Sequence, residues 1–177
     1  MKIIAISGKA RHGKTTTANM LKDIMQEDGK KAIVVSYGGY VKYISTAYYG
    51  WKGEKDEYGR TLLQNVGDGL RNTVSETIWI DKLMSDIEMI CSGYDYILID
   101  DCRYPNEVLI PKSMFDVICI RVIRQDFESD LTEEQLSHQS EIALDNFEFD
   151  YTISTGSGVD NLENPVKFIY DKIKAGE

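Results

Sequence analysis

The stretch from Ser7 to Leu21 reads SGKARHGKTTTANML and decides the fold of this chain. It follows a short β-branched apolar run and leads into apolar residues at helical spacing. The pattern G-x-x-x-x-G-K-[ST] is met by Gly8, Gly13, Lys14 and Thr15. Glycines let the backbone curl so that its N–H groups face phosphate oxygens, and the following helix adds the positive end of its dipole. A strand, this loop and a helix in succession therefore predict a site for the phosphates of a nucleotide.

The polar residues of this loop and of a later strand predict how ATP and Mg²⁺ are held. Lys14 is expected to reach the β- and γ-phosphates of ATP, and Thr15 to offer its hydroxyl to Mg²⁺. The predicted cofactor-binding residues are Gly8, Lys9, Gly13, Lys14, Thr15 and Thr16. An acidic residue at the end of a neighbouring strand should also serve the metal, and the segment YILIDD supplies Asp100 and Asp101. The residues alone leave open which of the two carboxylates does so.

Apolar segments at intervals along the chain predict one open α/β sheet. Strands are expected in residues 2–7, 31–37, 94–100, 115–122 and 149–154, and the last three are nearly continuous in apolar residues, as in a parallel sheet covered on both faces. Helical spacing follows the phosphate loop and recurs in residues 39–51, and Thr132 with Gln135 has capping-box spacing. We therefore expect an α/β, three-layer P-loop NTPase fold. Residues 1–177 should form a single domain with a five-stranded parallel sheet, helices on both faces and a short lid.

Charge and cysteine content exclude several classes of partner. The chain has 20 basic and 29 acidic residues, a net charge of -9, which disfavours binding to nucleic acid or to an anionic membrane. No segment reaches the ~18 apolar residues of a membrane span. Cys91, Cys102 and Cys119 have neither zinc nor disulfide spacing, which indicates a reduced, cytoplasmic protein. The expected partners are small-molecule nucleotides, with no nucleic acid and no membrane, and a homodimer is an option for the assembly.

The spread of arginines favours phosphoryl transfer over a GTPase switch. A switch would need D-x-x-G after an apolar strand, but the D-x-x-G from Asp56 to Gly59 lies in a polar run, and an N-K-x-D base reader is absent from the sequence. Moving a phosphoryl group between two anions requires cations on both substrates and on the transferred group. The candidates are Arg60, Arg71, Arg103, Arg121 and Arg124.

Several motifs make the sequence similar to the phage-type deoxynucleoside monophosphate kinases, a branch of the P-loop nucleoside monophosphate kinases. They are, in order over most of the chain, GKARHGKTT, YVKYISTAYYGWKGEKDEYGRTLLQNVGDGLR, the later Trp79, DDCRYPNEV and HQSE. The resemblance implies an acceptor-binding insertion near residues 37–80 and a lid near residues 122–141. It favours Asp101 over Asp100 as the acid near the metal, because Asp101 and Arg103 match the family's Asp-x-Arg. The family's Gly-Thr-acid-x-x-Arg appears here as GDGLR, which is shorter by one residue.

The resemblance also implies roles for individual side chains. Together with Lys14, the expected catalytic residues are Arg103, Arg121 and Arg124, the last two where the family enters its lid. The expected substrate-binding residues are Tyr37, Lys42, Arg60, Gln64, Arg71 and Trp79. His138 and Glu141 match the family's His-x-Ser-Glu, and their roles stay open.

The predicted function is ATP-dependent phosphoryl transfer to a deoxynucleoside 5'-monophosphate, which gives the diphosphate. One alternative is a kinase for another small phosphorylated acceptor, because HQSEIALDNFEFDYTIS also resembles animal-type phosphomevalonate kinases. Another is a regulatory protein that binds nucleotide without transferring phosphate. The aromatic side chains between Tyr37 and Trp79, some of which must be core, favour an acceptor with a base, since such rings stack on bases.

Overall fold

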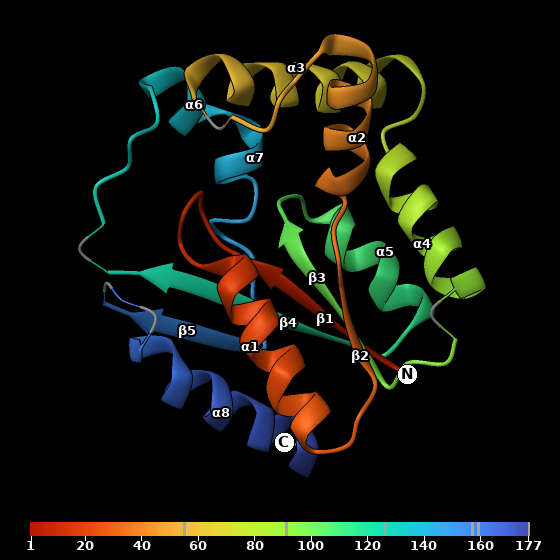
Figure 1. The fold of residues 1–177 in the computed structure, drawn as a ribbon, viewed down its shortest axis with the longest axis vertical. Helices are drawn as coiled ribbons and strands as arrows, with labels where there is room; N and C mark the ends of the chain where they lie inside the picture. Colours follow the sequence, from red (N-terminus) through yellow and green to blue (C-terminus); the bar gives the residue numbers. More distant parts are fainter. Residues whose placement is uncertain (55, 91, 126, 157, 159, 177) are drawn as a thin grey trace.

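Five parallel strands form one sheet in the described part of the chain (Figure 1). The computed structural model describes residues 1–54, 56–90, 92–125, 127–156, 158 and 160–176. The strands are β1 (Lys2–Ser7), β2 (Ala32–Val35), β3 (Tyr96–Cys102), β4 (Val117–Arg124) and β5 (Tyr151–Thr155). Their order in the sheet is β2-β3-β1-β4-β5, and every neighbouring pair is parallel. The predicted strands and the parallel sheet are confirmed.

Helices cover both faces of the sheet, and the alternation of side chains along β1 divides the core between them. Ile4 and Ile6 are buried in a cluster with α1 (Lys14–Glu27) and α8 (Asp160–Ala175). Ile3 and Ala5 point the other way and pack in a cluster with α4 (Ile78–Ile90) and α5 (Asn106–Met114). Because both faces of the strand are buried, β1 reads as a continuous apolar run. The three-layer α/β fold is confirmed.

Four further helices lie together beyond the sheet, at the top of Figure 1. They are α2 (Gly38–Tyr49), α3 (Glu57–Thr73), α6 (Glu133–Ser137) and α7 (Gln139–Ile142). The carboxylate of Asp56 caps α3 by accepting a hydrogen bond from the N–H of Gly59 at 2.7 Å, so this helix begins inside the polar run. Thr132 and Gln135 form the predicted capping box at the start of α6. These caps fix the helices that stand over the phosphate loop.

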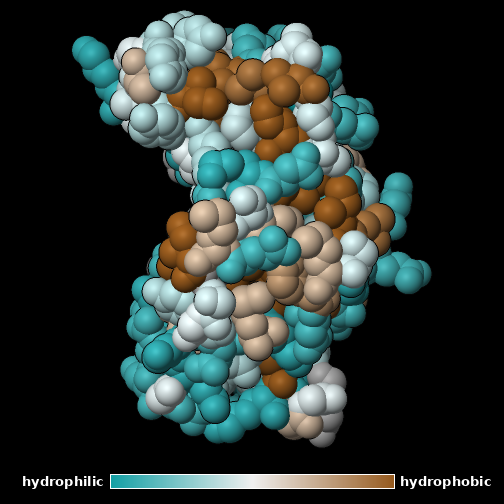
Figure 2. All heavy atoms as spheres, turned by 90° about the vertical axis from the view of Figure 1, so that its right-hand side faces the viewer, coloured by the Kyte–Doolittle hydropathy of each residue, from teal (hydrophilic) through white to brown (hydrophobic). Residues whose placement is uncertain are grey.

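Apolar side chains remain exposed on the side of the molecule that carries α2 and α4. Figure 2 shows them at the top and in the middle of this face, with hydrophilic side chains between them. Tyr48 on α2 and Met89 on α4 are each more than 75% exposed.

Cys102 and Cys119 are buried and free, whereas Cys91 lies outside the described residues. In the described part of the chain, no helix has both the length and the apolar character that crossing a membrane demands.

Candidate functional site

The phosphate loop connects β1 to α1 and has the curled backbone that its glycines predict. Gly8 and Gly13 have φ angles of 155° and 92°. A Cβ atom at Gly8 would overlap the carbonyl oxygen of Val122 on β4, so only glycine fits between the two strands. Lys14 folds back over the loop, and its ammonium donates to the carbonyl oxygens of Gly8 and Lys9 at 2.7 and 2.8 Å. The carbonyl oxygens of the loop thus hold the Lys14 side chain against the backbone of the loop.

Burial makes the ammonium of Lys14 easy to deprotonate. Lys14 is only 8% exposed, and burial, with the nearby Arg103 guanidinium, lowers its pKa to about 7. The carboxylates of Glu141, Asp101 and Asp100 oppose this shift. An anion placed beside Lys14 would favour the charged form and raise this pKa again.

Asp100, at the end of β3, lies against the loop. The hydroxyl of Thr15 donates to its carboxylate at 2.6 Å. Mg²⁺ prefers such hard oxygen ligands and takes one or two from the protein, the rest being water and phosphate. Among the described residues no group of three His, Cys, Asp or Glu side chains could enclose a metal ion. Thr15 and Asp100 therefore fit a magnesium ion that completes its shell with water and phosphate.

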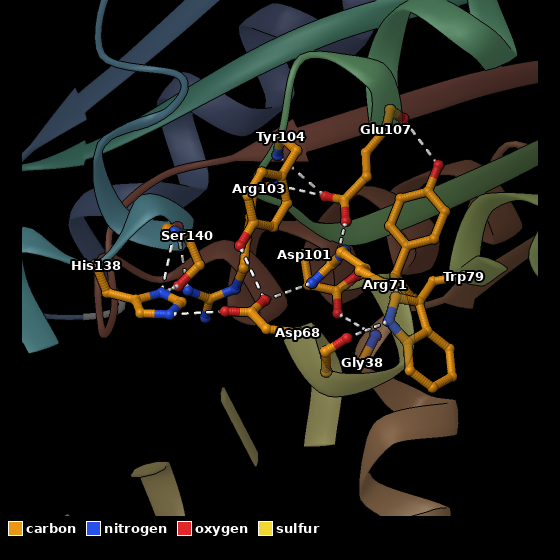
Figure 3. Close-up of polar contacts among 12 residues, drawn as sticks. Gly38, Asp68, Arg71, Trp79, Asp101, Arg103, Tyr104, Glu107, His138 and Ser140 are labelled. Atoms are coloured by element: carbon orange, nitrogen blue, oxygen red, sulfur yellow. Dashed lines mark hydrogen bonds and ion pairs between the residues drawn. The ribbon is translucent and has the colours of Figure 1, made fainter. Parts of the chain in front are cut away.

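Asp101 faces a different element, the start of α2 (Figure 3). Its carboxylate accepts hydrogen bonds from the N–H groups of Tyr37 and Gly38 at 2.9 and 2.7 Å. Burial and the adjacent Asp100 carboxylate raise the pKa of Asp101. The structure thus places Asp100, and not Asp101, against Thr15, which differs from the arrangement that the resemblance favours.

A cavity of about 470 Å³ lies between the phosphate loop, α2, α3, the end of β3 and the segment after β4. The predicted residues that line it are Gly13, Lys14, Thr15, Thr16, Lys42, Arg60, Gln64, Arg71, Asp100, Asp101 and Arg103. The predicted residues outside its lining are Gly8, Lys9, Tyr37, Trp79, Arg121 and Arg124. The cavity thus unites the loop with most of the predicted acceptor residues.

Tyr37 and Trp79 lie in the core beside the cavity. They are 2% and 3% exposed. The hydroxyl of Tyr37 donates to the carbonyl oxygen of Glu107 at 2.8 Å, and the indole N–H of Trp79 donates to that of Gly67 at 3.1 Å. Each polar tip thus has a partner inside the protein, which allows a large aromatic side chain to be fully buried. Tyr104 is the aromatic side chain among the described residues that line the cavity.

The wall opposite the loop is built around Arg71 of α3 (Figure 3). Its guanidinium donates to Asp68 at 3.2 Å and to Glu107 at 2.8 Å, and it lies 4.4 Å from the ring centre of Tyr104. Planar guanidinium groups bind carboxylates and phosphates in this way and stack on aromatic rings. Arg71 is therefore held in a fixed orientation.

Glu107, which the sequence reasoning did not select, ties this wall to the end of β3. It is 2% exposed, and its second carboxylate oxygen accepts from the N–H groups of Arg103 and Tyr104 at 2.7 and 3.1 Å. Burial raises its pKa to about 7, although these two N–H groups act in the opposite direction. One buried carboxylate thus positions both Arg71 and the backbone beside Arg103.

The segment after β4 reaches the cavity through His138 and Glu141. His138 Nδ1 accepts from the N–H of Ser140 at 3.2 Å, so Nε2 carries the proton that is donated to Asp68 over 2.9 Å. Glu141 forms an ion pair with Arg103 and accepts from the N–H of Ala10 in the phosphate loop at 2.8 Å. Both side chains thus fasten this segment to the cavity wall.

A second cavity, of about 600 Å³, lies on the other side of the loop. Lys9, His12, Arg124 and Phe127 are among its lining residues. The guanidinium of Arg124 lies 4.6 Å from the ring centre of Phe127, and the N–H of Arg124 donates to His12 at 3.2 Å. Burial and Lys14 lower the pKa of His12, which favours its neutral form. Arg124 thus contributes to a cavity with an aromatic wall.

Arg121 lies at neither cavity. Its guanidinium pairs with Asp145 at 2.9 Å and donates to the Ser7 hydroxyl at 3.3 Å. Asp145 also pairs with Lys9 at 3.0 Å, so the two predicted cations share one carboxylate. In this structure Arg121 connects β4 with the start of the phosphate loop.

Arg11, in the phosphate loop, was missed by the sequence reasoning. It has a φ of 62° and is the one residue other than glycine with positive φ among those described. Its side chain lines the 470 Å³ cavity and pairs with Asp130. An x position of the G-x-x-x-x-G-K pattern gives no signal of this orientation, because it depends on the turn of the loop.

The fold is shared with kinases of known structure. No protein-family model and no curated protein matches the sequence. Solved structures do match: a Chloroflexus aurantiacus protein described as a kinase (TM-score 0.55, 12% identity, covering 99% of this chain and 97% of the other) and the shikimate kinase of Acinetobacter baumannii with shikimate (0.52, 15%, 99% and 94%). The APS kinase CysC of Mycobacterium tuberculosis with AMPPNP and APS follows at a TM-score of 0.48 and 9% identity, covering 98% and 97%. Identities this low establish the fold alone.

Proposed function

We propose that this protein transfers the γ-phosphoryl group of ATP to a deoxynucleoside 5'-monophosphate. The observation that carries the proposal is the 470 Å³ cavity, which has cations at both ends. Lys14 stands at the loop end, whereas Arg60 and Arg71 stand on α3 at the other. Transfer between two anions needs this arrangement, because two sets of phosphates must approach each other against their mutual repulsion.

The loop end would hold the donor. The N–H groups of the loop and the start of α1 bind the phosphates, and Lys14 places its ammonium on the β- and γ-phosphates. Thr15 and Asp100 would hold Mg²⁺, which neutralises phosphate charge when bound. Arg124 and Phe127 in the second cavity offer a cation and an aromatic ring to the rest of the donor nucleotide.

The other end would hold the acceptor, and the reaction needs no general base. An oxygen of the acceptor's phosphate forms a bond to the γ-phosphorus, and the bond from that phosphorus to the β,γ-bridging oxygen breaks and leaves ADP. The attacking oxygen is already anionic, so no proton has to be removed. Lys14 and Arg103 balance the charge of the transferred group, and Glu107 keeps Arg71 turned toward the acceptor.

A base on the acceptor is supported by the polar and aromatic side chains at this end. The Tyr104 ring lies over Arg71, and the amide of Gln64 lines the same cavity. Amides pair with base edges through one donor and one acceptor, and rings stack on base faces. Mevalonate 5-phosphate has neither a base edge for the amide of Gln64 nor a flat face for an aromatic ring.

The test is a screen of phosphorylated acceptors with Mg-ATP. We expect at least one deoxynucleoside 5'-monophosphate to accelerate ADP release and to appear as the diphosphate, and mevalonate 5-phosphate to have no effect. Coupled ADP detection and chromatography of the products measure both. Turnover of mevalonate 5-phosphate with no response to any monophosphate would reverse the choice of acceptor. Tight binding of ATP with no stimulation by any acceptor would favour a regulatory nucleotide-binding protein.

Binding of ATP should take up a proton at alkaline pH. With a pKa of about 7, Lys14 is mostly neutral at pH 8 in the free protein, and the phosphates restore its charge. We expect uptake of about one proton per bound nucleotide at pH 8 and little at pH 6, where Lys14 is already charged. Calorimetric titration with Mg-AMPPNP in buffers of different ionisation enthalpy measures it. Equal binding enthalpies in all buffers at pH 8 would contradict this prediction.

A further inference from the structure

The carboxylate of Asp130 lies between two arginines that come from different parts of the chain. Its Oδ2 atom is 2.7 Å from Nη2 of Arg11 and 3.1 Å from Nη2 of Arg60, and its Oδ1 atom accepts from Nη1 of Arg60 at 3.4 Å. Arg11 belongs to the phosphate loop, Arg60 to α3, and Asp130 to the segment that precedes α6. A single anionic group thus joins the two ends of the proposed reaction.

The backbone of Arg11 indicates that this position serves more than the ion pair. A left-handed conformation costs free energy for a residue with a Cβ atom, and such residues gather at functional sites. The Arg11 and Asp130 side chains are 51% and 46% exposed, and ion pairs this exposed contribute little to stability. The pair therefore does not account for the conformation, which the turn of the phosphate loop imposes and which places the guanidinium at the cavity.

We propose that Arg11 and Arg60 bind the phosphate of the acceptor, and that the Asp130 carboxylate occupies this phosphate position until the acceptor displaces it. Both arginines line the cavity, and both present N–H groups to the same carboxylate. A phosphate dianion has one more oxygen and one more negative charge than a carboxylate, so it is the stronger ligand for two guanidinium groups. The proposal rests on the proposed function, since it names two residues of the acceptor site.

The position of Arg11 in the chain suits a site that brings the acceptor phosphate close to the donor phosphates. Arg11 lies three residues before Lys14, so it can place its charge between the donor and the acceptor phosphates. Displacing Asp130 frees the segment next to Leu131, which contributes to the lining of both cavities. Acceptor binding would in this way release a contact between the loop, α3 and the segment before α6.

The test compares Asp130→Asn and Arg11→Gln in binding and in turnover. The protein is first saturated with Mg-AMPPNP, which fills the phosphate loop. Inorganic phosphate and each of the four common deoxynucleoside 5'-monophosphates are then added in turn, and binding is followed by changes in the NMR chemical shifts of the protein. Asp130→Asn should tighten phosphate binding by roughly 3- to 10-fold, because the competing charge is gone. Arg11→Gln should weaken it roughly 10-fold, and Arg11→Lys should restore part of the loss. When Arg11→Gln is already present, Asp130→Asn should increase the affinity for phosphate by less than it does in the otherwise wild-type protein.

Asp116→Asn is the matched control, because it removes the same charge from another exposed carboxylate. Asp116 directly precedes β4 and pairs with Lys2. It should leave phosphate affinity unchanged. Phosphate affinity that is indifferent to both Asp130→Asn and Arg11→Gln would overturn the inference, even if monophosphates are turned over normally. The opposite result, phosphate binding that responds as expected while no monophosphate is a substrate, would support the anion site and contradict the proposed function instead.

Discussion

Replacing Lys14 with alanine is expected to lower kcat for phosphoryl transfer by about 100- to 1,000-fold. The ammonium lies against the phosphate loop, held by the carbonyl oxygens of Gly8 and Lys9, beside the place where the donor phosphates are proposed to bind. Charge that develops on the transferred group is stabilised most by a preorganised cation in a water-poor site. Single-turnover measurement of ADP formation with a saturating acceptor isolates this step.

Two comparisons make the Lys14→Ala result specific. Lys167→Ala removes the same charge from the exposed surface of α8 and should leave kcat unchanged. The far-ultraviolet circular dichroism of Lys14→Ala should match that of the wild type, because α1 keeps its buried apolar residues Ala18, Leu21 and Met25. Near-normal turnover by Lys14→Ala, with normal ATP affinity, would contradict the assignment of the phosphate loop to the donor site.

Replacing Glu107 with alanine is expected to lower the free energy of unfolding by about 3–5 kcal/mol at pH 8. At that pH the carboxylate is ionised, since its pKa is about 7. Its loss leaves the guanidinium of Arg71 without a buried partner, and the N–H groups of Arg103 and Tyr104 without an acceptor. Urea unfolding followed by fluorescence measures the change.

Glu107→Gln and Glu88→Ala separate the causes of this loss. The amide oxygen of glutamine can still accept the two hydrogen bonds from the N–H groups of Arg103 and Tyr104, which share one carboxylate oxygen in the wild type. Glu107→Gln should therefore be less destabilising than Glu107→Ala. Glu88 is exposed on α4, and Glu88→Ala should change stability by no more than about 0.5 kcal/mol. Equal stability of Glu107→Ala and the wild type would show that Glu107 does not support this wall.

The fold could be predicted because its signals are local. The strand segments are apolar runs, and both faces of β1 and β3 are buried, so each strand is visible without knowledge of its neighbours. The helix start at Thr132 follows from a capping box of adjacent residues. By contrast, α3 begins within the polar run at residues 53–60, where only the side chain of Asp56 marks the start.

The candidate site could be predicted only where one segment supplies it. The phosphate loop is such a segment, and its glycine conformations follow from its pattern. The pairing of Asp100 with Thr15 depends on how β3 lies beside β1, and the pairing of Asp101 with α2 depends on how β3 lies beside β2. Two adjacent aspartates in the sequence do not reveal either arrangement. Glu107 was missed because a glutamate at the start of a helix is usually exposed, and its burial depends on Arg71 from α3.

An aromatic count could not say which rings face a ligand. Tyr37 and Trp79 were expected at the substrate but lie in the core, whereas Tyr48 and Tyr58 are exposed on the surface. Whether such a ring points into the core depends on whether its hydroxyl or indole N–H finds a hydrogen-bond acceptor there. The acceptors for Tyr37 and Trp79 belong to residues that are distant in the sequence. Whether any of these rings contacts a substrate stays a prediction.

The two hydrogen bonds that Asp101 accepts from the N–H groups at the start of α2 have a mechanical consequence. They tether the first turn of that helix to the strand beside the phosphate loop, while the far end of the helix, at Tyr49, is exposed. A rotation of α2 about this pivot would sweep Tyr49 through the widest arc and barely move Asp100 against Thr15. A shift of α2 would therefore move the side of the cavity that Val41 and Lys42 line and leave the contact of Thr15 with Asp100 in place.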